Sequence, residues 1–173
     1  DIAEWFCTLP IDVAMLEPFA LAHFKLSRFD RPGGFLHGFK ERVLDVWQAA
    51  LAANDFTWDR CSPIIFISGP GCETGYHMDV SQVMAWQLYG QKRFCGLRDA
   101  ERWAPKDIRL SYKQQTLIRP DELTDDDALC YDMVFGDMLW NTLLTPHWIV
   151  AGDEASMSIN LSHGGLRLNG HLA

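Results

Sequence analysis

The stretch Pro63-Ile64-Ile65-Phe66-Ile67-Ser68, followed at once by Gly69-Pro70-Gly71, is the clearest indication of the fold class. A short apolar run that is bounded by proline and glycine is typical of a buried β-strand. Several runs of similar length follow it, and Gly90, Gly136 and Gly152 separate some of them. We expect these further strands at 83–89, 92–97, 129–135, 137–140, 147–150 and 156–161. Many short strands with turns between them predict an antiparallel sandwich or jelly roll.

The chain before this region has a helical pattern. From Gly38 to Asn54, apolar residues recur every three or four positions with charged residues between them, which predicts a helix. Residues 1–32 are interrupted by prolines and are expected to form short irregular elements. Between the strands we expect a helical turn at 99–106 and a solvated loop at 121–127, where five of seven residues are acidic.

The composition is typical of a folded protein, because 48% of the 173 residues are hydrophobic and 22% are charged. This length suits one domain over 1–173, with a helical N-terminal part at 1–60 and a jelly-roll core at 61–165. There are 15 basic and 23 acidic residues, so the net charge of −8 argues against a nucleic-acid partner. No run approaches the roughly 18 apolar residues of a membrane-spanning helix, and no signal peptide is recognisable. We therefore expect a cytoplasmic protein without a membrane partner.

The cysteines do not form a recognisable framework. Their number is odd, their spacing is wide and no two of them form a C-x-x-C pair: Cys7, Cys61, Cys72, Cys95 and Cys130. We therefore expect neither a disulfide framework nor a structural zinc site, which agrees with a reducing compartment.

The segment Thr74-Gly75-Tyr76-His77-Met78-Asp79 carries the first candidate metal ligands. Residues i and i+2 of a strand face the same side, so His77 and Asp79 would project together and supply two ligands of a facial triad for non-haem iron. Composition alone predicts about one such pair by chance, so taken alone it also fits a strand end with a hydrogen-bonded histidine. The candidate third ligand is His147, which follows a proline after the strand that starts at Gly136-Asp137.

With these residues in this order, the sequence from about Ile64 to Leu161 resembles the JmjC and cupin-like iron(II)- and 2-oxoglutarate-dependent oxygenases. The resemblance implies a double-stranded β-helix preceded by a helical segment. It also implies that His77, Asp79 and His147 bind Fe(II) and are the catalytic residues.

The same resemblance implies where the cosubstrate 2-oxoglutarate binds. Lys92 matches the lysine that holds the distal carboxylate in this family, and it can act as a point charge there. Thr74 matches a threonine that precedes the first ligand by three, and Asn160 matches a polar residue on a late strand near the cosubstrate. In the strand at 156–162, Asn160 shares one face with Ser156, Ser158 and Ser162, as a polar pocket requires.

Three departures from related patterns narrow the resemblance. Ser156-Met157-Ser158 lacks the arginine that many other 2-oxoglutarate oxygenases carry, which favours a lysine anchor. Val83 stands where some relatives have an asparagine. The His-x-His and glutamate pattern of sugar-isomerase cupins is absent, because Asp79 occupies the third position of the motif.

The resulting interpretation is a non-haem iron dioxygenase that uses 2-oxoglutarate and dioxygen to hydroxylate or demethylate a protein side chain or a small molecule. Two alternatives stay open: a metal-binding cupin without 2-oxoglutarate chemistry, and a non-catalytic cupin-like binding module. The sequence does not identify the substrate or the oligomeric state. Four aromatic residues close to the proposed ligands are expected to form substrate-pocket walls: Tyr76, Trp86, Trp140 and Trp148.

Overall fold

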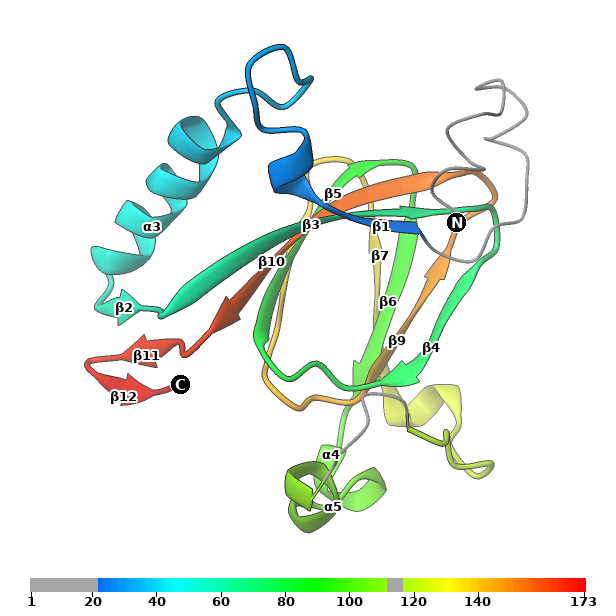
Figure 1. The fold of residues 1–173 in the computed structure, drawn as a ribbon. Coiled ribbons are helices and arrows are strands. Elements are labelled where there is room, and N and C mark those ends of the chain that lie inside the picture. Colours follow the sequence, from blue (N-terminus) through cyan, green and yellow to red (C-terminus); the bar gives the residue numbers. More distant parts are fainter. Residues whose placement is uncertain (1–21, 112–116) are drawn as a thin grey trace.

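In the computed structural model, two antiparallel sheets form the centre of the molecule (Figure 1). The structure describes residues 22–111 and 117–173, so the expectations for residues 1–21 lie outside the described part of the chain. The larger sheet contains, in spatial order, β1 (Ala22–Lys25), β3 (Arg60–Ser68), β10 (Ser156–Gly164), β5 (Gln82–Tyr89) and β8 (Met138–Asn141). The smaller sheet contains β4 (Glu73–His77), β9 (His147–Ala151), β6 (Lys92–Leu97) and β7 (Ala128–Met133).

The chain path through these sheets is that of a double-stranded β-helix. From β3 to β6 the strands alternate between the larger and the smaller sheet, and from β7 to β10 they alternate again in the opposite order. Both halves of the path therefore wind around one axis, with β10 paired between β3 and β5 and with β9 paired between β4 and β6. This strand order confirms the predicted jelly roll.

The N-terminal part contains the predicted helix and one strand that the sequence did not indicate. A π-helical turn, η2 (Lys40–Leu44), continues directly into α3 (Asp45–Ala52), close to the expected bounds of 38–54. Val43 and Trp47 of this helix pack against the apolar cluster on the outer face of the larger sheet, which includes Met84, Ile159 and Leu161. The short strand β1, followed by the 3-10 turn η1 (Leu26–Arg28), adds to the edge of that sheet by pairing with β3.

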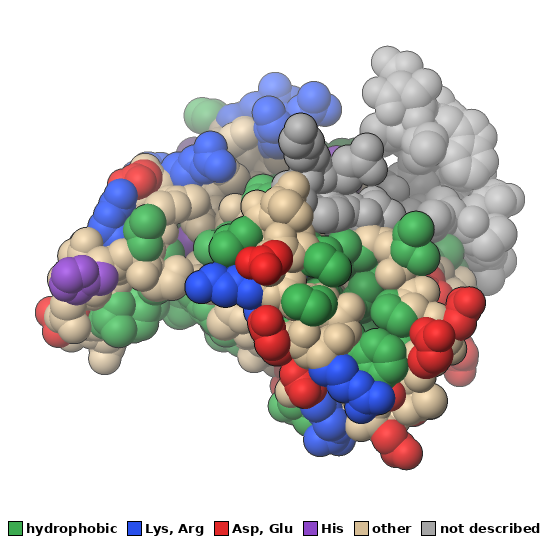
Figure 2. All heavy atoms as spheres, turned by 90° about the horizontal axis from the view of Figure 1, so that it is seen from below, with side chains coloured by type: hydrophobic (Ala, Val, Ile, Leu, Met, Phe, Trp, Pro, Cys, Tyr) green, Lys and Arg blue, Asp and Glu red, His purple; other side chains and the backbone are tan. Residues whose placement is uncertain are grey.

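The connection between β6 and β7 lies at the lower end of the barrel in Figure 1. It contains α4 (Ala100–Trp103), α5 (Lys106–Ser111) and the 3-10 turn η3 (Asp125–Asp127), in the places where a helical turn and an acidic loop are predicted. On this lower face, acidic and basic side chains lie next to each other (Figure 2). Within this connection the structure contains two ion pairs, Arg109–Glu101 at 2.8 Å and Arg102–Asp127 at 3.5 Å.

Three very short strands form a third sheet, apart from the two central ones. β2 (Phe56–Thr57), β11 (Arg167–Leu168) and β12 (His171–Leu172) form a separate antiparallel sheet beyond the end of β10. None of the helices in the described part of the chain has the length and apolarity that a membrane crossing requires.

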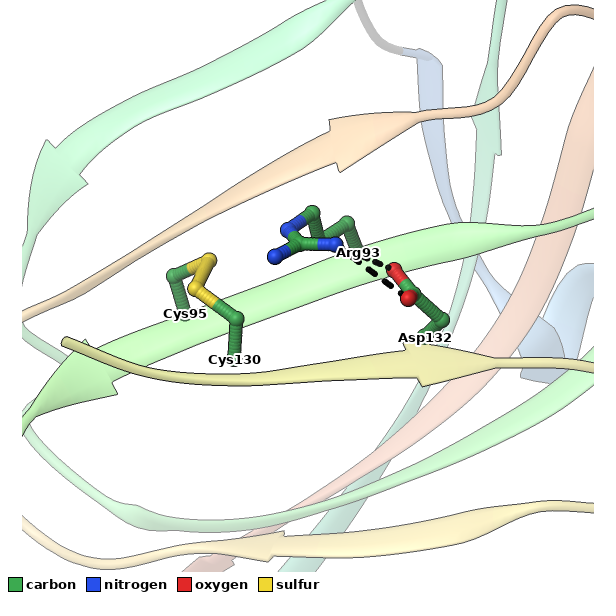
Figure 3. Close-up of a disulfide and its surroundings, with 4 residues drawn as sticks. All are labelled: Arg93, Cys95, Cys130 and Asp132. Atoms are coloured by element: carbon green, nitrogen blue, oxygen red, sulfur yellow. Dashed lines mark hydrogen bonds and ion pairs between the residues drawn. A yellow bond between two sulfur atoms is a disulfide. The ribbon is translucent and has the colours of Figure 1, made fainter. Parts of the chain in front are cut away.

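One disulfide contradicts the expectation for the cysteines. Cys95 of β6 and Cys130 of β7 are register partners, their Cα atoms are 4.1 Å apart, and their sulfur atoms are bonded. Figure 3 shows this bond on the same side of the two strands as the Arg93–Asp132 ion pair. The expectation that the cysteines are not joined by disulfides is therefore wrong for this pair. Disulfides are rare in a reducing compartment, the compartment that the cysteine pattern had favoured.

Candidate metal centre

Three side chains with metal-binding atoms meet at one end of the barrel. His77 ends β4, His147 begins β9, and the two residues are register partners across the smaller sheet. Asp79 lies two residues beyond the end of β4, so it is not a strand residue as the sequence predicted. One nitrogen or oxygen of each residue lies within 4.8 Å of those of the other two. This set of two imidazoles and one carboxylate suits iron and other first-row divalent metals.

Backbone carbonyl groups fix the orientation of both imidazole rings. Nδ1 of His77 lies 2.7 Å from the carbonyl oxygen of Gly75, and Nδ1 of His147 lies 2.9 Å from that of Thr145. A carbonyl oxygen can only accept, so each Nδ1 carries the proton and donates it. The lone pair of each Nε2 is then free, which is the arrangement that metal-binding histidines adopt.

His147 is held in the neutral form that a metal requires. Its side chain is 1% exposed, and Phe94 stacks on the ring at a centroid distance of 4.9 Å and an angle of 9°. Burial, followed by the neighbouring His77, lowers the pKa of His147 to about 4. At neutral pH the ring therefore carries no charge and does not repel a cation.

A cavity of about 60 Å³ extends from these residues into the barrel. Its walls come from inward-facing positions of neighbouring strands, which alternate with outward-facing ones because successive strand residues point to opposite sides. Apolar walls are formed by Phe66, Phe94 and Ile149, and polar ones by Thr74, Gln87, Lys92, Ser158 and Asn160.

Lys92 places a positive charge inside this cavity. Its side chain is buried, with an exposed fraction of 6%, and Nζ donates to Oγ of Ser158 at 3.1 Å. Lys92 forms no ion pair with any residue that the structure describes. Burial lowers the pKa of the ammonium group to about 8, so it is still mainly charged at pH 7. An anion bound in the cavity would supply the missing counter-charge.

The register gives the backbone separation, along the strand, between Lys92 and the position opposite His147. Along β6, Lys92 pairs with Ala151, and Gly96 pairs with His147. Four residues of a β-strand span about 13 Å. A small ligand that reaches from the ligand end toward Lys92 would therefore lie along the barrel axis.

Gln87 contributes an acceptor at the cavity wall. Its Nε2 donates to the carbonyl oxygens of Tyr89 and Gly90, at 2.7 and 3.2 Å, so the amide cannot be reversed without losing both bonds. Its Oε1 is buried and has no hydrogen-bond partner among the described residues. A water molecule or a donor group of a ligand would satisfy this atom.

The structure brings six of the sequence-predicted site residues to one cavity: His77, Asp79, His147, Thr74, Lys92 and Asn160. The four predicted pocket aromatics lie elsewhere. Tyr76 and Trp148 pack together on the outer face of the smaller sheet, and Trp86 and Trp140 pack on the outer face of the larger one. Each is next in sequence to a cavity residue, so strand alternation points it away from the cavity.

The cavity residues that were not predicted as site residues include Gln87, Phe94 and Asn141. Phe94 and Gln87 lie at inward-facing strand positions. Because side chains alternate along a strand, both could have been predicted once the inward-facing side of each strand was known. Asn141 ends β8 and contacts two of the three ligands, and no sequence pattern singles it out.

No protein-family model matches the chain, and no curated protein matches its sequence significantly. Solved structures with a similar fold include the ribosomal oxygenase YcfD from Escherichia coli, with 18% identity and a TM-score of 0.47 over 83% of this chain and 31% of that one. DMSP lyase DddQ from Ruegeria pomeroyi is 13% identical, with a TM-score of 0.41 over 64% of this chain and 43% of that one. A cupin domain from Bordetella pertussis is 10% identical, with a TM-score of 0.40 over 64% of this chain and 92% of that one.

These likenesses concern the fold. The chain spans less than half the length of DddQ and of YcfD. At such identities and TM-scores the activities of these proteins carry no argument for this chain.

Proposed function

We propose that this protein is an iron(II)- and 2-oxoglutarate-dependent oxygenase, with His77, Asp79 and His147 as the metal ligands. The observation that carries the proposal is the buried ammonium group of Lys92, which shares one cavity with the three ligand atoms. A dicarboxylate that also carries a metal-binding oxo group needs a buried cation and a metal site in the same cavity. Its distal carboxylate would pair with Lys92, and its other end would reach the metal.

The polar residues of the cavity fall into two groups with separate tasks in this proposal, the metal ligands and the residues that bind the distal carboxylate. His77, Asp79 and His147 hold one face of the metal and leave the opposite positions open. When bound, the iron supplies the redox chemistry by which the 2-oxo acid and dioxygen are converted. Lys92 compensates the distal carboxylate, and the hydroxyl groups of Thr74 and Ser158 can donate hydrogen bonds to it.

The apolar part of the cavity excludes water. Phe66, Phe94 and Ile149 line it, and Phe94 also covers one face of the His147 ring. A dry, shaped cavity strengthens the attraction between Lys92 and an anion and limits side reactions in the absence of the substrate.

The test is anaerobic addition of Fe(II) and 2-oxoglutarate to the metal-free protein. The expected result is a visible metal-to-ligand charge-transfer band, followed by succinate when air is admitted. The absence of both the band and succinate would contradict the proposal.

Lys92→Met separates this function from metal chemistry without a 2-oxo acid. Removing one partner of a buried charge pair costs about 2–5 kcal/mol, so 2-oxoglutarate binding should weaken by roughly 30-fold or more. Lys106→Met, on the exposed surface of α5, is the matched control. If Lys92→Met left 2-oxoglutarate binding unchanged while the protein still bound Fe(II), a metal-binding cupin with other chemistry would be the better description.

A further inference from the structure

Asp79 differs from the two histidine ligands in how the fold holds it. His77 and His147 belong to paired strands, and their rings are fixed by the carbonyl groups of Gly75 and Thr145. Asp79 follows the end of β4 and belongs to no strand, so no ladder fixes its backbone. A carboxylate that rotates freely would be a poor third ligand, because the ligand atoms must converge within a fraction of an ångström.

The end of β8 and the connection after it supply what the strand does not. Asn141 is the last residue of β8 and its side chain is 4% exposed. Its Nδ2 donates to Oδ2 of Asp79 at 3.2 Å, and the backbone N–H of Leu144 donates to the Asp79 carbonyl oxygen at 2.9 Å. Side chain and backbone of Asp79 are therefore both held by residues 141–144.

The amide orientation of Asn141 follows from its surroundings. If the amide were reversed, Oδ1 would face the Asp79 carboxylate, and two acceptors would meet. Nδ2 also lies 3.3 Å from Nδ1 of His147, but that nitrogen already donates its proton to the carbonyl oxygen of Thr145. The hydrogen bond from Nδ2 to Asp79 is therefore the one that Asn141 makes to the metal ligands.

The oxygen that Asn141 holds is the one that faces the ligand cluster. Oδ2 of Asp79 lies 3.6 Å from Nε2 of His147, the ring nitrogen left free for a metal. A hydrogen bond to this oxygen fixes the rotation of the carboxylate and keeps it directed toward both imidazoles. A bond to an ionised carboxylate is also stronger than one between neutral groups.

We propose that Asn141 is a positioning residue that orients the Asp79 carboxylate for metal binding. The inference rests on the metal site of the proposed function but not on its cosubstrate. Residues that orient metal ligands typically contribute about 10- to 100-fold to metal affinity. Asn141 contacts the ligands directly, at the only carboxylate of the triad.

The test uses Co(II), whose visible absorption reports both binding and coordination geometry, added to the metal-free full-length protein without 2-oxoglutarate. Asn141→Leu keeps the approximate size and removes the donor. The expected result is a Kd for Co(II) about 10- to 100-fold higher than that of the wild type, with a changed spectrum at saturating cobalt. Asn54→Leu is the matched control, because it makes the same exchange just after α3, where the amide Nδ2 donates to the carbonyl oxygen of Ala50 and not to a metal ligand.

Thermal unfolding of the metal-free variants separates positioning from stability. A purely structural role would lower the unfolding temperature and leave the Kd and the spectrum of the folded protein unchanged. If Asn141→Leu does not fold, Asn141→Ser removes the amide with a smaller side chain and is measured in the same way.

The outcomes distinguish this inference from the proposed function. A Kd and a spectrum like those of Asn54→Leu would overturn the role of Asn141 alone. A wild-type protein that does not bind Co(II) would overturn both. An affinity loss in the Asn141 variants supports the inference even if 2-oxoglutarate is never converted.

Discussion

Two histidines are deeply buried, His147 inside the barrel and His163 on the outer face of the larger sheet. They are alike in burial but differ in the hydrogen bonds of their ring nitrogens. Each is 1% exposed, and each has an aromatic ring stacked on it, Phe94 on His147 and Trp140 on His163. Both have pKa values lowered by burial. By these measures the two residues could have the same role.

The ring nitrogens separate them. In His163, Nε2 accepts from Nε1 of Trp47 at 2.9 Å, and Nδ1 lies 3.3 Å from the carbonyl oxygen of Gln82. In His147, Nδ1 is used by the Thr145 carbonyl group, while Nε2 points to Asp79 and the ligand cluster. His147 can bind a metal because its Nε2 is free. Both nitrogens of His163 have hydrogen-bond partners, and this residue joins α3 to the sheet. Burial alone does not identify a site.

The largest difference is expected in metal affinity. His147→Ala removes a ligand, so the Kd for Co(II) should rise by more than the roughly 100-fold that loss of a supporting residue can cause. His163→Leu should leave this Kd within about threefold of the wild type, since ordinary surface and core changes away from a site act through stability. Absorption titration of the two purified variants checks both. Equal losses of Co(II) affinity in the two variants would show that His147 and His163 do not differ in metal binding.

The second expected effect is on the free energy of unfolding, which the substitution of His163 should lower. His163→Leu leaves Nε1 of Trp47 without its acceptor in an apolar cluster, which costs about 1–3 kcal/mol of unfolding free energy. Urea unfolding of the metal-free protein measures this. A variant as stable as the wild type would show that the imidazole does not fasten α3.

A smaller change tests the same bond from the helix side. Trp47→Phe keeps most of the aromatic contact with Met84 and Leu161 but removes the donor to His163. The expected loss is about 1 kcal/mol plus a packing term, and metal affinity should not change. Tryptophan fluorescence during unfolding follows the transition, with His163→Leu as reference. Combining the two substitutions should cost less than the sum of the single effects, because both remove one bond.

The smallest effect is the pH dependence of stability. Burial holds the pKa of His163 in the folded protein below the ordinary value of about 6.5. As the pH falls below about 6.5, the unfolded chain binds a proton at this residue before the folded protein does, so stability decreases, by at most about 1.4 kcal/mol per pH unit. Above about pH 7.5 the contribution of His163 is complete. Urea unfolding of metal-free wild type and His163→Leu between pH 5 and 8 isolates it, because other groups contribute equally to both. Parallel curves would contradict the prediction.

The sequence predicted the fold because its signals are local. The bounds of β6 coincide with the expected strand at 92–97, and the helix before the barrel lies where the periodicity places it. The metal-ligand candidates could be selected because the order of His77, Asp79 and His147 along the chain is rare by chance, whereas the cosubstrate candidates came from the resemblance to a known family. Their roles stay proposals, and their common cavity is what the structure adds.

The errors share one cause, which is that facing direction and strand pairing are not local. Tyr76 and Trp148 are adjacent to ligands in sequence but point to the opposite side of the smaller sheet. Cys95 and Cys130 become neighbours only because β6 pairs with β7 in one particular register. Asn141 meets Asp79 because β8 lies beside β5, whose first residues follow the ligand segment.

The Cys95–Cys130 disulfide also determines what happens if the chain is cut. It joins residues 35 apart in sequence, and α4, α5 and the acidic turn all lie between them. A protease that cleaves within this connection would leave two fragments that stay covalently attached, and both sheets would still contain all of their strands. The connection at the lower end of the barrel can therefore be opened by a single cleavage while the two halves of the protein stay covalently linked, and after reduction of the disulfide only the strand pairing between them holds the halves together.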